Sequence, residues 1–416
     1  MKRIRTAIVH YTAPPIVGGV EAVIQAHAQM LVRNHYPLTI VAGRGSETAL
    51  PAGANLCLVP EMDSQHPLIT QANSSLEKGE VPAAFDDLVD QLAASLLPTL
   101  SQFDNVIVHN IFTKHFNLPL TAALCRLLDE SAVRRCIAWC HDFTWTSPNS
   151  RAKVHPGYPW DLLRRYRPDM IYVVVSHQRQ RSLAALLGCP PERIHVIYNG
   201  VDPQTLLGLS EEGYALAKRL GLLESDLVLL MPVRVTQAKN IEYALRVVAA
   251  LKAHHCRPKL ILTGPPDPHD EKSLAYFRTL QALRSQLGVE QDMRFVFESG
   301  PDADQAFLLD ARVVGDLFRL SDVMFMPSHR EGFGMPVLEA GLAGVPVVCT
   351  GVPAAEEIGG DDVLLFDTAQ NPAQVAEQIL ARLEQSPSYR LRRRVRQNYS
   401  WQAIFQRDIE ALLSHE

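Results

Sequence analysis

Short apolar runs alternate along this chain with stretches in which apolar residues recur at helical spacing. In the first half, the runs predict strands at Ile4–Val9, Leu38–Val41, Asn105–His109, Arg135–Trp139 and Ile171–Val175. The helical spacing predicts helices over Val20–Val32, Val81–Leu97 and His177–Leu187. Residues 60–82 are polar, and we expect them to form a long, mobile loop. Regular alternation of strand and helix favours a parallel sheet covered by helices on both faces.

A second series of the same kind begins after the turn residues Asn199-Gly200 and Asp202-Pro203. Its strands are predicted at Leu227–Pro232, Lys259–Thr263, Arg294–Glu298, Val323–Met326 and Pro346–Cys349. Its helices are predicted over Asn240–Ala253, Glu271–Leu287, Val313–Leu320 and Pro336–Ala343. The two series predict two Rossmann-like, doubly wound α/β domains, 1–200 and 201–398, that face a central cleft. Ligands of such sheets bind outside the carboxyl ends of the strands.

Length and composition fit this plan. The 416 residues allow two domains, and 47% hydrophobic with 20% charged residues is ordinary for a globular protein. The formal net charge of −5 argues against a nucleic-acid partner. Seven scattered cysteines indicate a reduced, cytoplasmic protein.

The start of the chain lacks the apolar core of a signal peptide, and we see no apolar run that could span a bilayer. Basic residues cluster at 160–167 and at 390–396. Each cluster is more typical of a solvated helix face, but peripheral contact with the inner face of the membrane stays open.

The most specific local pattern runs from Ser328 to Ala340, after the apolar stretch 322–327. Glu331 and Glu339 flank a turn, Gly332–Met335, that opens a helix. A turn of this kind favours a diphosphate, because unpaired N–H groups and the helix dipole both attract anions. Glu339, early in the helix, can accept hydrogen bonds from ribose hydroxyls. Glu331 precedes the turn, and we expect it to point toward the group that the diphosphate carries and to contact its hydroxyls. The pattern predicts a nucleotide-sugar site.

This string resembles the signature of the retaining nucleotide-sugar glycosyltransferases of family four (glycosyltransferase group 1). The resemblance implies the GT-B fold, with the acceptor on the first domain, the donor on the second, and residues 399–416 forming a helix that crosses back to the first domain. It implies transfer of a hexosyl unit, glucosyl or mannosyl favoured, from a UDP- or GDP-linked donor to an acceptor hydroxyl with retention. The acceptor class stays open among a carbohydrate, a small metabolite and a lipid-linked sugar.

Two cations follow the strand Leu227–Pro232. Arg234 and Lys239 lie on the loop before the next helix, where fixed positive charge would stabilise a departing nucleoside diphosphate. The stretch resembles the diphosphate clamp of the family, although Val233 stands where members usually have glycine. The resemblance also places the backbone of Phe333, Gly334 and Met335 near the sugar and phosphate.

The first domain contributes further candidates at its strand ends. Gly18, Gly19 and Glu21 resemble a family loop that touches the donor phosphate and lines the acceptor side. His141 follows the strand Arg135–Trp139, and the resemblance places it at the donor sugar; the alternative is a histidine satisfied by local backbone. The acceptor-side candidates are Glu21, His109, Asn110 and Asp142. For the base pocket we expect Phe297–Gly300 and the helix around Asp316-Leu317.

No essential cofactor or metal is expected. Cys136, Cys140 and His141 lie close together without a second pair of ligands. Asp302-Ala-Asp304 matches an Asp-x-Asp metal motif, but in the wrong context, and the cationic clamp already supplies counter-charge. Two other functions stay open: a sugar-nucleotide epimerase of the same fold, and a non-catalytic nucleotide-sugar-binding protein.

Overall fold

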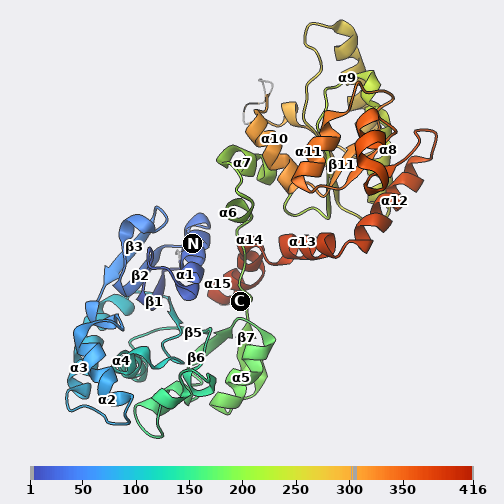
Figure 1. Ribbon diagram of the computed structural model, residues 1–416. Coiled ribbons are helices and arrows are strands. Elements are labelled where there is room, and N and C mark those ends of the chain that lie inside the picture. Colours follow the sequence, from blue (N-terminus) through green and yellow to red (C-terminus); the bar gives the residue numbers. More distant parts are fainter. Residues whose placement is uncertain (1–3, 301, 303–306, 415–416) are drawn as a thin grey trace. The chain divides into compact units, whose positions relative to one another are not determined.

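The computed structural model describes residues 4–300, 302 and 307–414 (Figure 1). The chain forms two compact units, one of residues 1–200 with 401–416 and the other of residues 201–400. Each unit contains one sheet, and the two are described separately below.

The sheet of the first unit is fully parallel, in the order β3-β2-β1-β4-β5-β6-β7. Its strands are β1 (Thr6–Thr12), β2 (Leu38–Arg44), β3 (Ala54–Leu58), β4 (Asn105–His109), β5 (Cys136–Cys140), β6 (Met170–Val174) and β7 (Ile194–Val196). The helices are α1 (Gly19–Arg33), α2 (Pro67–Leu76), α3 (Phe85–Leu100), α4 (Leu118–Asp129), α5 (His177–Leu187), α14 (Trp401–Ile404) and α15 (Glu410–Ser414). The strand order reverses beside β1, so β1 and β4 flank the point where ligands of such sheets bind.

The prediction of a mobile loop over residues 60–82 is wrong. A 3-10 turn covers Pro60–Met62, and α2 follows. Three apolar residues of α2, Ile69, Ala72 and Leu76, lie three and four positions apart and are buried against the core. Helical periodicity was therefore present among the polar residues. The helix predicted to begin at residue 81 begins instead at Phe85, and β3, β7 and α4 were not predicted.

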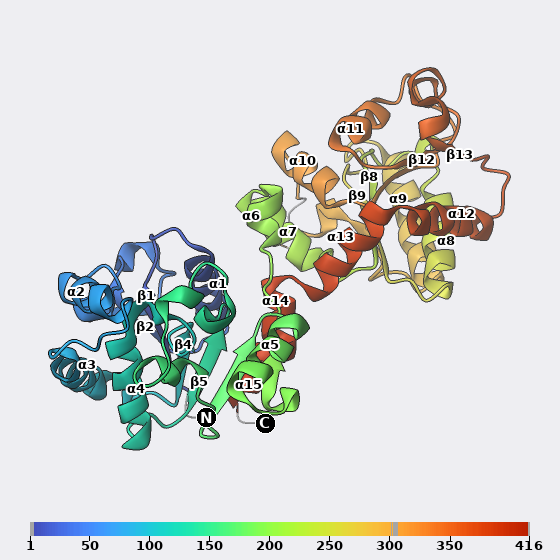
Figure 2. The same ribbon diagram turned by 60° about the horizontal axis from the view of Figure 1, so that its bottom comes forward.

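The C-terminal segment packs on the first unit. Between α14 and α15 the chain continues as a π-helical turn, Phe405–Ile409. Phe405 and Ile404 are fully buried in a cluster that includes Ile8 of β1 and Trp139 of β5. Figures 1 and 2 both place α14 and α15 beside this sheet. Residues 401–414 thus complete a core that otherwise belongs to residues 4–200.

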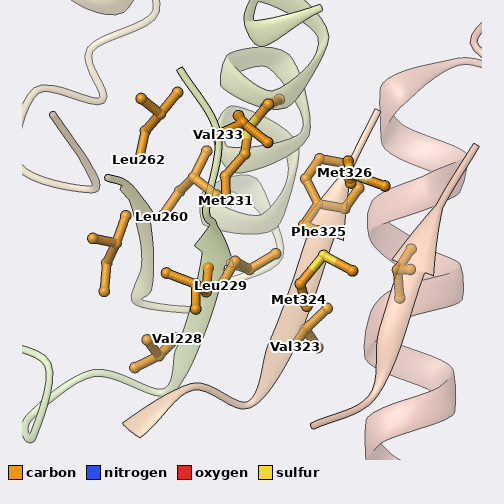
Figure 3. Close-up of a cluster of buried hydrophobic side chains, with 14 of the residues drawn as sticks. Val228, Leu229, Met231, Val233, Leu260, Leu262, Val323, Met324, Phe325 and Met326 are labelled. Carbon is orange, nitrogen blue, oxygen red and sulfur yellow. The ribbon is translucent and has the colours of Figure 1, made fainter. Parts of the chain in front are cut away.

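The sheet of the second unit is also parallel, in the order β10-β9-β8-β11-β12-β13. Its strands are β8 (Leu227–Met231), β9 (Pro258–Leu262), β10 (Met293–Phe295), β11 (Val323–Met326), β12 (Val347–Cys349) and β13 (Leu364–Leu365). Its helices are α6 (Pro203–Leu207), α7 (Glu211–Leu220), α8 (Ile241–Ala253), α9 (Glu271–Gln286), α10 (Ala311–Leu320), α11 (Met335–Ala343), α12 (Pro372–Gln385) and α13 (Pro387–Asn398). Strands β8, β9 and β11 carry most of the buried side chains labelled in Figure 3, among them Met231, Leu260 and Phe325.

The order of this second sheet matches that of the dinucleotide-binding Rossmann fold, with its reversal between β8 and β11. Two Rossmann-like parallel-sheet domains are therefore confirmed. The carboxyl ends of β8 and β11 lead directly into the two loops that carry the strongest motifs of the sequence.

The basic clusters are partly used inside each unit. In α13, Arg396 is buried and pairs with Asp322 at 2.9 Å, and Arg393 lies 3.4 Å from Asp226. In the first unit, Arg167 pairs with both Asp129 and Asp169. The expectation of plain solvated faces is therefore wrong for these residues. Over the described ranges, no helix combines the length and apolarity needed to cross a membrane.

Candidate active site

In the second unit, the loop after β8 and the loop after β11 lie against each other. Since β8 and β11 are neighbouring parallel strands, their carboxyl ends open on the same edge of the sheet. The backbone N–H of His329 donates to the carbonyl oxygen of Ala238 at 2.8 Å. This bond joins the segment that carries Arg234 and Lys239 to the segment that carries Glu331.

The centre of this junction is an ion pair between Lys239 and Glu331. Lys239 Nζ lies 2.6 Å from Glu331 Oε1 and 2.7 Å from Oε2, and the two side chains are 20% and 10% exposed. The hydroxyl of Ser328 donates to Glu331 Oε1 at 2.7 Å, and the carbonyl of Ser328 accepts from Thr350 Oγ1 at 2.6 Å. These contacts fix the position of both carboxylate oxygens of Glu331. The sequence predicted separate ligands for Lys239 and Glu331, and the structure brings the two together.

The turn before α11 depends on Gly334. This residue has φ +102°, in the left-handed region, and a Cβ there would lie 3.2 Å from Val352 Cγ2, so glycine is the residue that fits. Pro336 has no N–H, and the N–H of Val337 donates to the carbonyl of Gly334 at 2.9 Å. The backbone N–H groups left for the predicted anion site are therefore those of the residues before Pro336.

Four further candidates of this unit are exposed at the same edge or just after it. They are Arg234, Phe333, Met335 and Glu339. A cavity of about 430 Å³ also opens here, lined by Ser328, His329, Thr350 and the chain from Leu365 to Gln370. Exposed side chains beside a fixed ion pair suit a ligand that enters from solvent.

The prediction that Asp316 lines a base pocket is wrong. Its side chain is fully buried and accepts hydrogen bonds from the backbone and hydroxyl of Ser210. It also pairs with Arg319. This carboxylate ties α10 to the start of α7 and is not free to meet a nucleotide base.

In the first unit, Glu21 lies underneath the loop between β1 and α1. It accepts from Thr12 Oγ1 at 2.6 Å, and its Oε1 lies 3.7 Å from His10 Nε2. These neighbours lower the pKa of Glu21 to about 2, the interaction with His10 contributing most and the hydrogen bond from Thr12 less. A Cβ on Gly18 would lie 2.1 Å from Glu21 Oε2, so the position of this carboxylate requires glycine there. An atom added at Gly19 would meet nothing within 4 Å.

His141 lies at the carboxyl end of β5 and is 8% exposed. Asn110, with φ +61°, accepts from the N–H of His141 at 2.7 Å and from the N–H of Asp142 at 3.2 Å. His141 Nε2 is 3.0 Å from His109 Nδ1. Burial, with the charge of His10 as a lesser cause, lowers the pKa of His141 to about 4. Its imidazole is therefore neutral at pH 7.

His109 and Asn110 were predicted on the acceptor side, and their side chains are instead buried. The His109 ring is fully covered and stacks on Trp139 and on His141. The side-chain oxygen of Asn110 accepts from the backbone N–H groups of His141 and Asp142. Both residues thus hold His141 in place, and only Asp142 and Glu21 are left as acceptor-side candidates among the four.

A wider buried cluster surrounds this pair, and reasoning from the sequence missed it. His27 of α1 packs on Trp139 and on Trp401 of α14, and its two ring nitrogens have no hydrogen-bond partner among the described residues. Burial lowers the pKa of His27 to about 3 and that of His109 well below its usual value. His10 could have been found by the rule that found His141, since it too lies near a strand end. No local signal connects His27 with Trp401.

Two sequence motifs resemble metal sites but were not expected to bind metal: Asp302-Ala-Asp304 and the group of Cys136, Cys140 and His141. Asp304 of the Asp302-Ala-Asp304 sequence lies outside the described residues. Cys136 and Cys140 are buried in β5, and burial raises the pKa of the Cys140 thiol to about 12.

Comparison with known families matches both units. Residues 215–400 match the family described as glycosyl transferases group 1, and residues 17–205 match Glycosyltransferase Family 4. An uncharacterized glycosyltransferase of Methanocaldococcus jannaschii is 26% identical over 365 residues, which cover 85% of this chain and 82% of that protein.

Other relatives match over less of their length. The mannosylglucosylglycerate synthase of Petrotoga mobilis is 24% identical over 65% of this chain, which spans 64% of that protein. A D-inositol 3-phosphate glycosyltransferase of Thermomonospora curvata is 30% identical over 53% of this chain and 50% of its own length. Among solved structures, a glycosyltransferase from Rickettsia africae aligns over 100% of this chain and 99% of its own, at 15% identity and a TM-score of 0.37.

Proposed function

The chain belongs to the glycosyltransferases of group 1 and Family 4, and from this membership we propose that it transfers a hexosyl unit, glucosyl or mannosyl, from a nucleoside diphosphate sugar to an acceptor hydroxyl with retention. The observation that carries the proposal is the junction of Lys239 and Glu331 at the carboxyl ends of β8 and β11. A cation and a carboxylate, both largely shielded from water, stand beside a helix N-terminus that suits a diphosphate.

In this proposal the second unit binds the donor. Lys239 and the exposed Arg234 neutralise the diphosphate, on which negative charge grows as the glycosidic bond breaks. The amides before Pro336 meet phosphate or sugar oxygens, and Glu339 accepts from ribose hydroxyls. When the donor enters, Glu331 gives up its contact with Lys239 and accepts hydrogen bonds from sugar hydroxyls instead. Its oxygens already face the position that Lys239 occupies without ligand.

In this proposal the first unit binds the acceptor and provides the neutral imidazole of His141. His141, held by Asn110 and His109, can exchange hydrogen bonds with a sugar hydroxyl without adding charge. For retention we propose a front-face route. The acceptor oxygen bonds to the anomeric carbon on the side from which the diphosphate leaves, and the departing phosphate oxygen accepts the acceptor proton. No metal or cofactor takes part in this proposal.

The first experiment is a thermal-shift panel of UDP, GDP and their glucose and mannose conjugates, without and with magnesium. We expect one base and its sugar conjugate to raise the melting temperature. NMR of the product anomer then tests retention. Binding without hydrolysis or transfer would favour the non-catalytic alternative, and release of an epimerised nucleotide-sugar would favour the epimerase. No shift with any nucleotide would overturn the proposal.

A matched pair of variants separates the clamp from general charge effects. Lys239→Met removes the cation of the junction, and we expect turnover to fall about a hundredfold. Lys252→Met removes a lysine from the end of α8, where it pairs with Asp292 at 2.8 Å. The second variant should keep full activity. Equal activity of the two variants would remove Lys239 from the mechanism.

A further inference from the structure

A pocket of about 390 Å³ opens within the first unit, apart from the residues discussed above. One wall is the segment that the sequence predicted to be a loop, and it contributes Ser64, Gln65, Thr70, Asn73, Ser74 and Glu77. The other wall is His115, Phe116 and Lys153. Its volume is in the range of small-molecule sites.

The pocket is connected to the carboxyl edge of the sheet that carries His141. His115 and Phe116 lie in the segment after β4, which ends at His109. The N–H of His115 donates to Thr144 Oγ1 at 3.1 Å, and Thr144 follows β5, as His141 does. Thr113 Oγ1 donates to the carbonyl of Asp142 at 2.8 Å. The pocket and His141 therefore share the same two strand-end loops.

The wall formed by α2 is held in a fixed position. Ile69, Ala72 and Leu76 bury one face of the helix in the core, which turns Thr70, Asn73 and Ser74 outward. Asn73 Nδ2 donates to the carbonyl of Phe116 at 2.8 Å and so fixes α2 to the opposite wall. Phe116 stays 40% exposed, which leaves an aromatic face at the pocket.

The polar groups of the pocket carry no net charge. Glu77 and Lys153 are its charged groups, and they pair with each other at 2.9 Å. His115 is neutral at pH 7, because burial lowers its pKa to about 4. His115 Nδ1 lies 3.0 Å from Thr144 Oγ1, and His115 Nε2 lies 4.0 Å from Glu77 Oε1. Lys114 lies over the Phe116 ring but does not line the pocket.

We propose that this pocket binds the acceptor and that the acceptor is an uncharged, hydroxyl-rich carbohydrate. Hydroxyl and amide side chains both donate and accept, as sugar hydroxyls do, and Phe116 offers an apolar face to a sugar ring. A phosphorylated sugar would bring negative charge to a site whose one cation is already paired and whose carboxylate repels it. The proposal rests on the proposed glycosyltransferase function and selects one class among the acceptors left open.

The test measures binding to the full chain by ligand-observed NMR, in matched pairs: glucose with glucose 6-phosphate, and myo-inositol with inositol 3-phosphate. Maltose serves as a longer uncharged probe. We expect at least one uncharged probe to bind at least tenfold more tightly than the phosphorylated ones. Binding of phosphorylated probes alone, or of no probe, overturns the proposal.

Two variants place the binding in this pocket. Thr70→Val removes one hydroxyl at constant shape and should weaken the uncharged probe about tenfold. Glu77→Gln frees Lys153 and should shift the preference toward the phosphorylated member of each pair by about tenfold. Glu80→Gln, on an exposed residue just beyond, is the control and should change neither value. Unchanged affinity for the uncharged probe in Thr70→Val, together with an unchanged preference in Glu77→Gln, would place the probe elsewhere.

The nucleotide-shift panel separates this inference from the proposed function. A donor that binds the second unit while every uncharged probe fails would sink the acceptor inference alone. A chain that binds an uncharged sugar but no nucleotide would sink the glycosyltransferase proposal instead.

Discussion

Replacing Glu331 by glutamine should affect nucleotide binding and turnover in opposite directions. Without ligand, the carboxylate holds Lys239 through both oxygens, at 2.6 and 2.7 Å. An incoming diphosphate must take Lys239 from this partner. Glutamine has nearly the same shape, and its amide oxygen can still accept from Ser328. The substitution therefore removes the charge and little else.

The expected size follows from the burial of the pair. Hydrogen bonds to charged groups contribute about 1.5–3 kcal/mol, and fully exposed ion pairs contribute about 0–1 kcal/mol. The side chains of Lys239 and Glu331 are only 20% and 10% exposed. We therefore expect competition from Glu331 for Lys239 to cost the diphosphate about 1.5 kcal/mol of binding free energy. That energy corresponds to a factor of about ten, so UDP or GDP should bind up to tenfold more tightly. Turnover should fall about a hundredfold, because the carboxylate no longer accepts from the sugar in the transition state.

Calorimetric titration with the nucleoside diphosphate measures the first effect, and initial rates with the matching nucleotide-sugar measure the second. Glu339→Gln is the comparison, because the proposed ribose contact predicts weaker nucleotide binding there. Thermal unfolding confirms that each variant is folded. Weaker diphosphate binding in Glu331→Gln would refute the competition with Lys239. A rate within threefold of the unaltered chain would refute the role of Glu331 in transfer.

Three further outcomes test the first unit. Gly18→Ala should push Glu21 off Thr12, which lowers the unfolding free energy by about 1 kcal/mol in urea titration, while Gly19→Ala should be neutral or slightly stabilising; equal effects would contradict the contact. Because the folded pKa of His27 is depressed to about 3, its contribution to stability is complete above pH 6.5 and is lost as the pH falls through 3. A leucine there should flatten the decline in melting temperature between pH 7 and 4, and an unchanged slope would exclude His27 as a source. Phe405→Ala should lower the unfolding free energy by about 3–5 kcal/mol, and a loss under 1 kcal/mol would show that the C-terminal segment is not part of this core.

Local sequence patterns predicted most of the secondary structure and one part of the candidate site, the turn before α11. The turn before α11 could be read because Gly334 and Pro336 act on their own neighbours, through a left-handed φ and a missing N–H. In the second unit, β8 to β12 could be read because both faces of a parallel sheet are buried, so each of these strands is a continuous apolar run, whereas the two-residue β13 was missed. The helix α2 was missed because its three buried residues stand among polar ones. They stabilise the helix only by packing on the core, which the sequence does not show.

The sequence by itself therefore determined the alternation of strands and helices, the two βα series, and the chemical groups that stand at strand ends. Only the tertiary structure decided which of those groups meet. Lys239 and Glu331 pair because β8 and β11 are neighbours in the sheet, although 92 positions separate them in the chain. His109 stacks on His141 and packs against His27 of α1, and His27 in turn packs on Trp401 of α14. Chain neighbours fix backbone geometry through short-range sterics and hydrogen bonds, whereas strand order and packing bring distant side chains within bonding distance.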